Sequence, residues 1–385
     1  MNTLLYLLLT LVLLSIMVVI HELGHFLFAK LFKVTVLEFS VGMGPAIYTT
    51  KNRKLKKSVS EKNEIDIAEN FRSNDDEKLN TDALTECEGA HKTVFSIRTL
   101  PIGGYVSMAG EDDESDDPNA FHKKPVWQRF IITVAGAVMN ILLGVICMFT
   151  LVGMESAQDG FLASNTIHSF QENSISDKGE SALKAGDTVI KVDGVRVHTG
   201  NELVYEIMNS GYEPIDLVVI RDGKQVTLND VTFPTETQSG ATFGNYDFVM
   251  QAEKADFGTV MKHSFFRSFS TVKVIIDSLV DLVGGRYGAD AVSGPVGMAG
   301  AVGEATKSGI NSVLYLFTLI TMNLGVFNLL PVPALDGGRL IFLIIEGIRR
   351  KPVKKEIEQG VNTVGIMILM ALMLFITVKD IFNLF

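Results

Sequence analysis

Two histidines and a glutamate lie together in the first apolar run of the chain, in the order His21-Glu22-Leu23-Gly24-His25. On an α-helix the two imidazoles, four residues apart, would share one face with the Glu22 carboxylate beside them. This pattern is typical of a zinc site in which a carboxylate acts as the base toward a bound water. In a soluble helix, a chance match is the alternative. Because ionisable groups inside a membrane span are costly, we interpret this cluster as a metal site.

A third ligand should lie at a similar depth, because a catalytic zinc site takes three protein ligands and keeps one open position. Asp336 is the only acidic residue in the apolar stretch 323–338. Pro331 and Pro333 precede it, and they predict a helix break within the membrane just before the carboxylate. The two glycines that follow remove side-chain bulk, which would let another helix or a substrate backbone approach. The alternative is a kinked span in which Asp336 serves only as an N-cap.

The 385-residue chain is 47% hydrophobic, and its apolar residues fall in long blocks. Blocks of about 20 apolar residues are long enough to cross a bilayer, so the sequence predicts a polytopic α-helical membrane protein. Four transmembrane spans are expected, at residues 1–32, at 127–155, at 311–348 with a break, and within 349–385 after a basic loop. The first span is expected to remain in the mature protein, because no basic segment precedes it and the histidines lie within it.

Basic residues predict the orientation of the spans. The short loop 349–355 between the last two spans is rich in Lys and Arg and should therefore be cytoplasmic. Both termini and residues 155–310 would then be extracytoplasmic, and residues 31–126 would be cytoplasmic. The first and third spans would run in the same direction, which places the histidines and Asp336 at one depth toward the cytoplasmic side. We assign no partner to the net charge of −10, and no nucleic acid.

With HELGH in the first span and NLLPVPALDGG at 328–338 in the third, the chain resembles the site-two protease family of intramembrane zinc metalloproteases. The resemblance covers nearly the whole chain and includes FSVGMGP at 39–45, PIGGYV at 101–106, AG through N at 135–140, and SGP at 293–295. A single PDZ-like region between the second and third spans resembles the RseP or RasP branch. The protein would then lie in the bacterial cytoplasmic membrane.

The resemblance implies one zinc ion per chain, bound by His21, His25 and Asp336, and it assigns Glu22 as the general acid and base. It also implies that the third span handles the substrate backbone near its prolines. The residues expected to contact substrate, from that span and from two glycine-rich strands, are Asn328, Pro331, Pro333, Gly42, Gly44, Gly103 and Gly104. Ligand type alone leaves other divalent ions open.

Residues 33–126 should form a β region on the cytoplasmic side. The segments 34–48 and 94–108 are rich in β-branched and aromatic residues with turn glycines, which predicts a hairpin-like sheet. Its edge could pair with an unwound substrate segment and present one peptide bond to the metal, or the sheet could simply cap the site. A polar insert, 51–92, separates the strands where the family has a short link. We expect it to be flexible and to regulate access, bind a cytoplasmic partner or form a bland surface insertion.

Residues 156–237 have a mixed, soluble composition and are expected to form an extracytoplasmic PDZ-like domain. The segment 181–195 resembles the helix-turn-strand-turn of PDZ domains, and strands are predicted at 215–221 and 225–233. No convincing carboxylate-binding loop lies near the start of this domain. Capture of peptide tails and steric exclusion of bulky ectodomains therefore both stay open as roles.

The segment 238–310 is expected to be an extracytoplasmic linker. It contains a stretch at 257–282 that mixes Phe, Val, Ile and Leu with Lys and Arg. This composition predicts an amphipathic helix at the membrane interface, and a soluble packing helix is the alternative.

Together these features predict an endopeptidase that cleaves within transmembrane segments of single-pass membrane proteins, such as anti-sigma factors or remnant signal peptides. The choice of substrate class rests on the resemblance. The alternative is a catalytically silent membrane adaptor that binds through its PDZ-like domain and keeps a structural metal. Glu22 and the missing fourth ligand argue against that alternative, because structural zinc sites close all four positions with protein ligands. Metal transport would require a further series of acidic or histidine residues along the spans.

Overall fold

The computed structural model describes residues 2–50, 93–111, 115–238, 241–286 and 294–382. The chain divides into two compact units. One unit comprises Met1–Leu7, Ile141–Phe327 and Met367–Phe385, and the other comprises Leu8–Asn140 and Asn328–Ile366. The insert predicted at 51–92, with its expected flexibility, lies outside the described residues.

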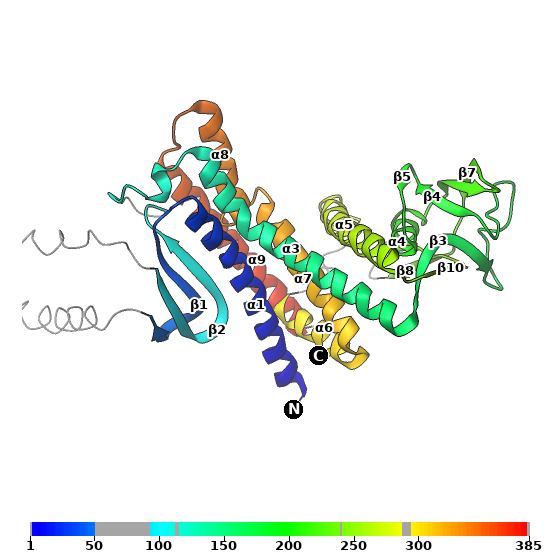
Figure 1. Ribbon diagram of the computed structural model, residues 1–385, viewed down its shortest axis with the longest axis horizontal. Coiled ribbons are helices and arrows are strands. Elements are labelled where there is room, and N and C mark those ends of the chain that lie inside the picture. Colours follow the sequence, from blue (N-terminus) through cyan, green and yellow to red (C-terminus); the bar gives the residue numbers. More distant parts are fainter. Residues whose placement is uncertain (1, 51–92, 112–114, 239–240, 287–293, 383–385) are drawn as a thin grey trace, which may run out of the picture. The chain divides into compact units, whose positions relative to one another are not determined.

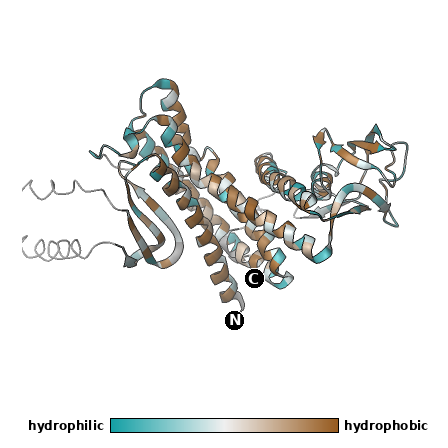
Figure 2. Ribbon diagram, viewed as in Figure 1, coloured by the Kyte–Doolittle hydropathy of each residue, from teal (hydrophilic) through white to brown (hydrophobic). Residues whose placement is uncertain are grey.

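Four helices in the described part of the chain are long and apolar enough to cross a membrane, as the sequence predicts. They are α1 (Asn2–Leu31), α3 (Val126–Asp159), α7 (Ile310–Leu329) and α9 (Lys355–Phe382). Figure 2 shows hydrophobic residues along the length of these helices. Each has at least the roughly 20 residues that one crossing of the hydrocarbon core requires. The chain is therefore a multi-pass membrane protein by length and composition of its helices.

The third apolar block is broken directly before Asp336, which confirms the predicted break. A short helix, α8 (Asp336–Arg349), follows α7 after a turn that contains Pro331 and Pro333. Asp336 is the first helical residue and Leu335 is the N-cap, so the alternative that Asp336 is an N-cap is wrong. With a rise of 1.5 Å per residue, α8 is about 21 Å long and does not cross a bilayer alone.

Two bent strands, β1 (Val36–Thr49) and β2 (Val94–Met108), form the predicted hairpin-like sheet beside α1 (Figure 1). Each strand contributes two segments to this sheet. The register places the segments in the order 46–49, 94–98, 36–41 and 104–108. The bends use Gly42, Gly44 and Gly103 at positive φ, a conformation that residues with a Cβ rarely adopt. The segment 104–108 therefore lies at one edge of the sheet.

The other unit contains a six-stranded antiparallel sheet in the order β10-β3-β4-β6-β7, with β5 paired to β4. Its strands are β3 (Phe161–Phe170), β4 (Thr188–Val192), β5 (Val195–Arg196), β6 (Ile215–Arg221), β7 (Lys224–Val231) and β10 (Phe248–Lys254). A separate pair is formed by β8 (Thr235–Gln238) and β9 (Ala241–Gly244). Helix α4 (Gly200–Ser210) buries Leu203 and Ile207 in the apolar core of this sheet.

Two expectations for this region require correction. The predicted strands at 215–221 and 225–233 are present as β6 and β7, but the helix expected at the start of 181–195 is not formed, and turns stand there instead. Gly186 lies at φ 91°, which ends any helix at that point. The domain boundary at 237 is also wrong, because β10 pairs with β3 and the sheet continues to Lys254.

Helix α5 (Phe257–Val283) confirms the helix predicted at 257–282, and helix α6 (Pro295–Ser308) follows it. The face of α5 that packs against protein is mostly polar. Its buried side chains are Thr259, His263, Ser264, Ser268, Thr271 and Ile275. The exposed face is an apolar stripe of Phe257, Met261, Phe265, Phe269, Ile276, Val280 and Val283. This arrangement is the reverse of a helix that packs on a soluble core.

Candidate metal centre

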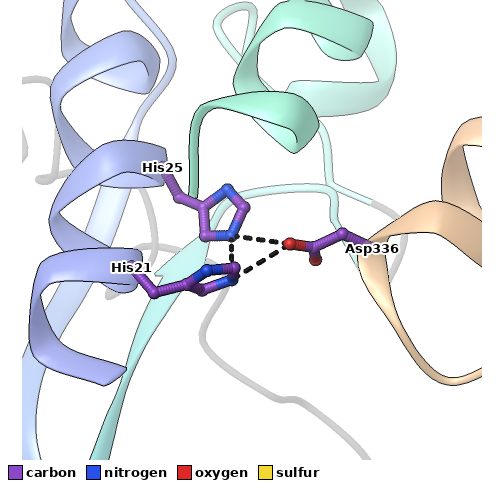
Figure 3. Close-up of side chains that lie close together, drawn as sticks. All are labelled: His21, His25 and Asp336. Atoms are coloured by element: carbon purple, nitrogen blue, oxygen red, sulfur yellow. Dashed lines mark hydrogen bonds and ion pairs between the residues drawn. The ribbon is translucent and has the colours of Figure 1, made fainter. Parts of the chain in front are cut away.

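His21 and His25 lie one turn apart on α1, and their rings meet edge to face. Their Nε2 atoms are 3.1 Å apart. Figure 3 shows both Nε2 atoms directed toward the carboxylate of Asp336. The spacing of four residues therefore brings two imidazole nitrogens close together on one face of a helix that is apolar enough to cross a membrane.

Asp336 completes a group of three possible ligands. Its Oδ2 atom lies 3.0 Å from His21 Nε2 and 3.3 Å from His25 Nε2, and the three ligand atoms all lie within 4.8 Å of one another. Although this oxygen is buried, no hydrogen bond of good geometry reaches it within the described residues. A buried acceptor that faces two ring nitrogens suits a shared cation. Two nitrogen donors and one carboxylate oxygen suit zinc.

The turn before α8 fixes the position of Asp336. A Cβ on Gly337 would collide with the Leu330 carbonyl group, and a Cβ on Gly338 would lie 2.6 Å from the Val332 carbonyl oxygen. The glycines therefore allow the chain's own preceding turn to fold against the start of α8. This finding replaces the expectation that they make room for another helix or a substrate.

Outer contacts orient both imidazole rings. His25 Nδ1 lies 2.8 Å from the Ile132 carbonyl oxygen, so the ring donates there and leaves Nε2 free to bind a cation. His21 Nδ1 lies 3.4 Å from the side-chain amides of Asn140 and Asn328. Either amide can turn its oxygen toward the ring N–H, which would fix the same tautomer in His21. Both histidines thus have supporting partners of the kind that metal-binding histidines require.

Two glycines allow α1 and α3 to approach closely at the site. A Cβ on Gly136 of α3 would lie 2.7 Å from His21 Nε2 and closer still to His25 Nε2. On α1, a Cβ on Gly24 would meet the Ala135 carbonyl group. Gly136 therefore leaves room beside the ring nitrogens that any side chain at this position would fill.

Glu22 connects the histidine helix to the sheet. Its Oε2 atom accepts a hydrogen bond of 3.0 Å from the backbone N–H of Val106. Val106 lies in the edge segment 104–108, and its N–H is donated to the carboxylate rather than to β1. A group able to carry protons is thus held next to the three possible ligands.

The sequence matches the profile of Peptidase family M50 over residues 9–59 and 80–372. This chain belongs to peptidase family M50. A Clostridium perfringens protein whose provisional name is zinc metalloprotease is 33% identical over 377 residues, which cover 98% of each chain. Zinc metalloprotease RasP of Geobacillus kaustophilus is 28% identical over 447 residues, 95% of each chain. Regulator of sigma-W protease RasP of Bacillus subtilis is 27% identical over 453 residues, 96% of each chain.

Membership of family M50 confirms the resemblance stated from the sequence. The protein is a zinc metalloprotease, a hydrolase whose cofactor is zinc. Its four apolar helices make it a membrane member of that family.

The M50 chain brings some of the residues predicted to contact substrate to the metal centre. Asn328 reaches the metal centre because its side-chain amide lies 3.4 Å from His21 Nδ1. Pro331 and Pro333 shape the turn before Asp336, and Pro333 also packs against Gly365 of α9. These prolines therefore have a structural role in the turn that precedes Asp336, the third possible ligand.

The four glycines predicted to contact substrate lie in the sheet. Gly42 and Gly44 stand in its bends, where they face other parts of the same hairpin. Gly103 and Gly104 lie against Val18 and Val19 of α1, the helix that carries the histidines. Only Gly103 and Gly104 lie at the segment 104–108, in which the Val106 N–H donates to Glu22.

Sequence reasoning missed several groups of this M50 site. The motif AG through N was noted at 135–140, but neither Gly136 nor Asn140 was given a role. An asparagine and a glycine within an apolar run were the available sequence signals. The Ile132 carbonyl and the Val106 N–H are backbone groups, whose partners no side-chain pattern reveals.

Proposed function

We propose that this M50 peptidase is an intramembrane endopeptidase that hydrolyses a peptide bond within transmembrane segments of single-pass membrane proteins. The observation that carries the proposal is the convergence of His21, His25 and Asp336 next to Glu22. The histidines and Glu22 lie on α1, a helix with the composition of a membrane span, and Asp336 begins α8 after the break that ends another such helix, α7. Ionisable groups at such depth are costly and are kept where they function. The proposed zinc ligands are the two histidines and Asp336.

The chemistry follows from the groups present. Zinc bound at this site would lower the pKa of a water and polarise the scissile carbonyl. Glu22 takes the proton of the attacking water and then delivers it to the leaving amine. The Val106 N–H holds one oxygen of Glu22, which leaves the other carboxylate oxygen for proton transfer. Within the described residues the cluster has three metal-binding side chains, which supports an open fourth position and argues against a purely structural metal.

A substrate segment must unwind to react, because a helix engages its own carbonyl groups. The edge segment 104–108 offers an extended backbone that an unwound substrate could join as a further strand. Its contact with Glu22 supports this role, since a peptide paired there would lie next to the proposed base. We include Gly103, Gly104 and Asn328 in this substrate-handling region.

We propose a PDZ-like fold for the sheet and α4, and we assign it the role of a steric filter for bulky ectodomains. β3 lies beside α4 and pairs with β10 on one side and β4 on the other. A peptide therefore has no open edge of β3 to join, which supports exclusion over capture of peptide tails. The name of the Bacillus subtilis relative, a regulator of sigma-W protease, supports anti-sigma factors as one substrate class.

We further propose that the protein lies in the bacterial cytoplasmic membrane with both termini outside and the metal centre toward the cytoplasm. The basic loop between α8 and α9 supports this orientation. The apolar stripe of α5, exposed along the whole helix, supports its placement at the membrane interface.

The test is cleavage of a single-pass protein in lipid vesicles that contain the purified enzyme, with the cut mapped by mass spectrometry. The proposal predicts a cut inside the apolar segment that stops when zinc is removed with a chelator and resumes when zinc is restored. A cut outside the apolar segment, or cleavage that continues without zinc, would contradict it.

A further inference from the structure

Arg339 lies one turn after Asp336 on α8 and joins that helix to two other elements. Its guanidinium forms an ion pair with Glu111, which follows β2, and its Nε atom lies 3.9 Å from Glu358 of α9. The guanidinium carbon also lies 5.9 Å from the centre of the Phe121 ring. The side chains of Arg339 and Glu111 are 26% and 15% exposed, so this pair is largely withdrawn from solvent.

Glu111 stands close to the strand segment that holds Glu22. β2 ends at Met108, and a backbone hydrogen bond of 3.4 Å from Glu111 to Met108 forms the turn that follows. The Ala109 N–H donates a hydrogen bond of 2.9 Å to the carbonyl oxygen of Thr35, which directly precedes β1, and this fixes the turn against the start of the sheet. Glu111 is thus a short, well-anchored extension of the segment that contains Val106.

The start of α8 needs such an anchor. Its N-cap, Leu335, supplies no side-chain hydrogen bond, and the residue before it, Ala334, has a positive φ of 74°. A helix start without a cap is less stable than a capped one, so its position depends on tertiary contacts. The Arg339 ion pair is such a contact, and it lies within one turn of the carboxylate of Asp336.

We propose that Arg339 and Glu111 are positioning residues, which hold the Asp336 turn in register with the strand that holds Glu22. The path runs from Asp336 through α8 to Arg339, across the ion pair to Glu111, and back along β2 to Val106. This series of contacts thereby fixes the position of Asp336, the proposed zinc ligand, relative to Glu22, the proposed proton carrier. This inference rests on the proposed zinc site, because Asp336 must be a ligand for its position to affect metal binding.

A second ion pair on α8 provides a matched control. Arg129 of α3 donates to Glu346 through its two terminal guanidinium nitrogens, and these side chains are 12% and 16% exposed. Both pairs line a cavity of about 320 Å³. Glu346 lies two turns after Arg339, so this pair anchors the far half of α8 and not the turn that carries Asp336.

The experiment measures zinc affinity of the full-length protein by competition with a chelator, together with the thermal unfolding midpoint. Arg339→Gln and Glu111→Gln are each expected to weaken zinc binding about 10- to 100-fold, the range for supporting partners of metal ligands. The double variant should lose no more than either single one, because both changes break the same contact. Arg339→Lys, which keeps the charge, should recover part of the affinity. Arg129→Gln should lower the unfolding midpoint while zinc affinity stays within twofold of wild type.

The proposal is overturned if Arg339→Gln binds zinc within twofold of wild type, or if Arg129→Gln weakens zinc binding equally. The second result would mean that any loosening of α8 has the same effect. His25→Ala in the same assay separates this failure from failure of the proposed function. If His25→Ala binds zinc as tightly as wild type, the zinc site itself is wrong.

Discussion

The backbone N–H of Val106 donates a hydrogen bond of 3.0 Å to the carboxylate of Glu22. This contact joins the edge of the β1–β2 sheet to the helix that carries His21 and His25. The group proposed to move protons and the strand proposed to receive substrate are therefore adjacent in the folded chain.

Removing the Val106 N–H should reduce turnover without loss of metal. In Val106→Pro the donor is absent, and because that N–H is not used in the ladder with β1, the sheet should tolerate proline at this edge. We expect kcat to fall about 10-fold or more, as for loss of a group that supports general base catalysis. Val106→Ala keeps the N–H and is the control, with activity close to wild type. Equal kcat in the proline and alanine variants would show that the hydrogen bond has no part in catalysis.

A methyl group at Gly136 should disturb the metal centre. The added Cβ would lie 2.7 Å from His21 Nε2, so at least one imidazole must move. A displacement of about 1 Å in such a site costs about 100-fold in rate. Gly136→Ala should therefore lose activity and zinc affinity, as measured by cleavage and chelator competition.

The control for that experiment lies on the same helix. A Cβ at Gly153 of α3 would meet no atom within 4 Å. Gly153→Ala should keep full activity and gain up to about 1 kcal/mol in stability from helix propensity. If Gly136→Ala retains as much zinc and activity as Gly153→Ala, the close approach of Gly136 to the histidines is not required for function.

Loss of the Asp336 charge should release zinc. Asp336→Asn keeps the size of the side chain but removes the negative charge that faces both histidine nitrogens. Metal analysis after dialysis against a weak chelator should find zinc in wild type and little in this variant. Full zinc occupancy in Asp336→Asn would exclude this carboxylate as a ligand.

The sheet should lose stability in acid through Glu38. Burial alone would raise the pKa of Glu38, but hydrogen bonds from Ser96, Tyr105 and Arg98 outweigh it and lower that pKa. A carboxyl group with a lowered pKa stabilises the fold above its unfolded pKa of about 4.3 and loses that effect as pH falls through the lower folded value. The unfolding midpoint of Glu38→Gln should therefore lie below that of wild type at pH 7. The difference should shrink below about pH 4. A difference that is constant with pH would assign the effect to packing instead of charge.

Much of the site could be predicted because its signals are local or compositional. His21 and His25 follow the helical period, and Asp336 is a lone acid beside two prolines in an apolar stretch. The break before α8 follows from the geometry of proline at Pro331 and Pro333. Residues with a strong local preference thus led directly to the helices that carry the metal centre.

Other parts depended on contacts between distant segments. Gly136 acts through its closeness to histidines more than a hundred positions away, and the Val106 N–H belongs to the backbone. The sheet beyond residue 237 was missed because β10 is recognised by its pairing with β3, not by its own composition. The turns at 181–187 replaced an expected helix because Gly186 requires a positive φ.

The role of Glu22 is tested most directly by cleavage of a single-pass substrate in vesicles by Glu22→Gln, with bound zinc measured in the same preparation. Glutamine keeps the shape of the side chain but cannot take a proton from water. We predict one zinc per chain, as in wild type, and a loss of cleavage of about 10²- to 10⁴-fold. Cleavage at the wild-type rate by the zinc-loaded variant would contradict the assignment of Glu22 and the mechanism built on it.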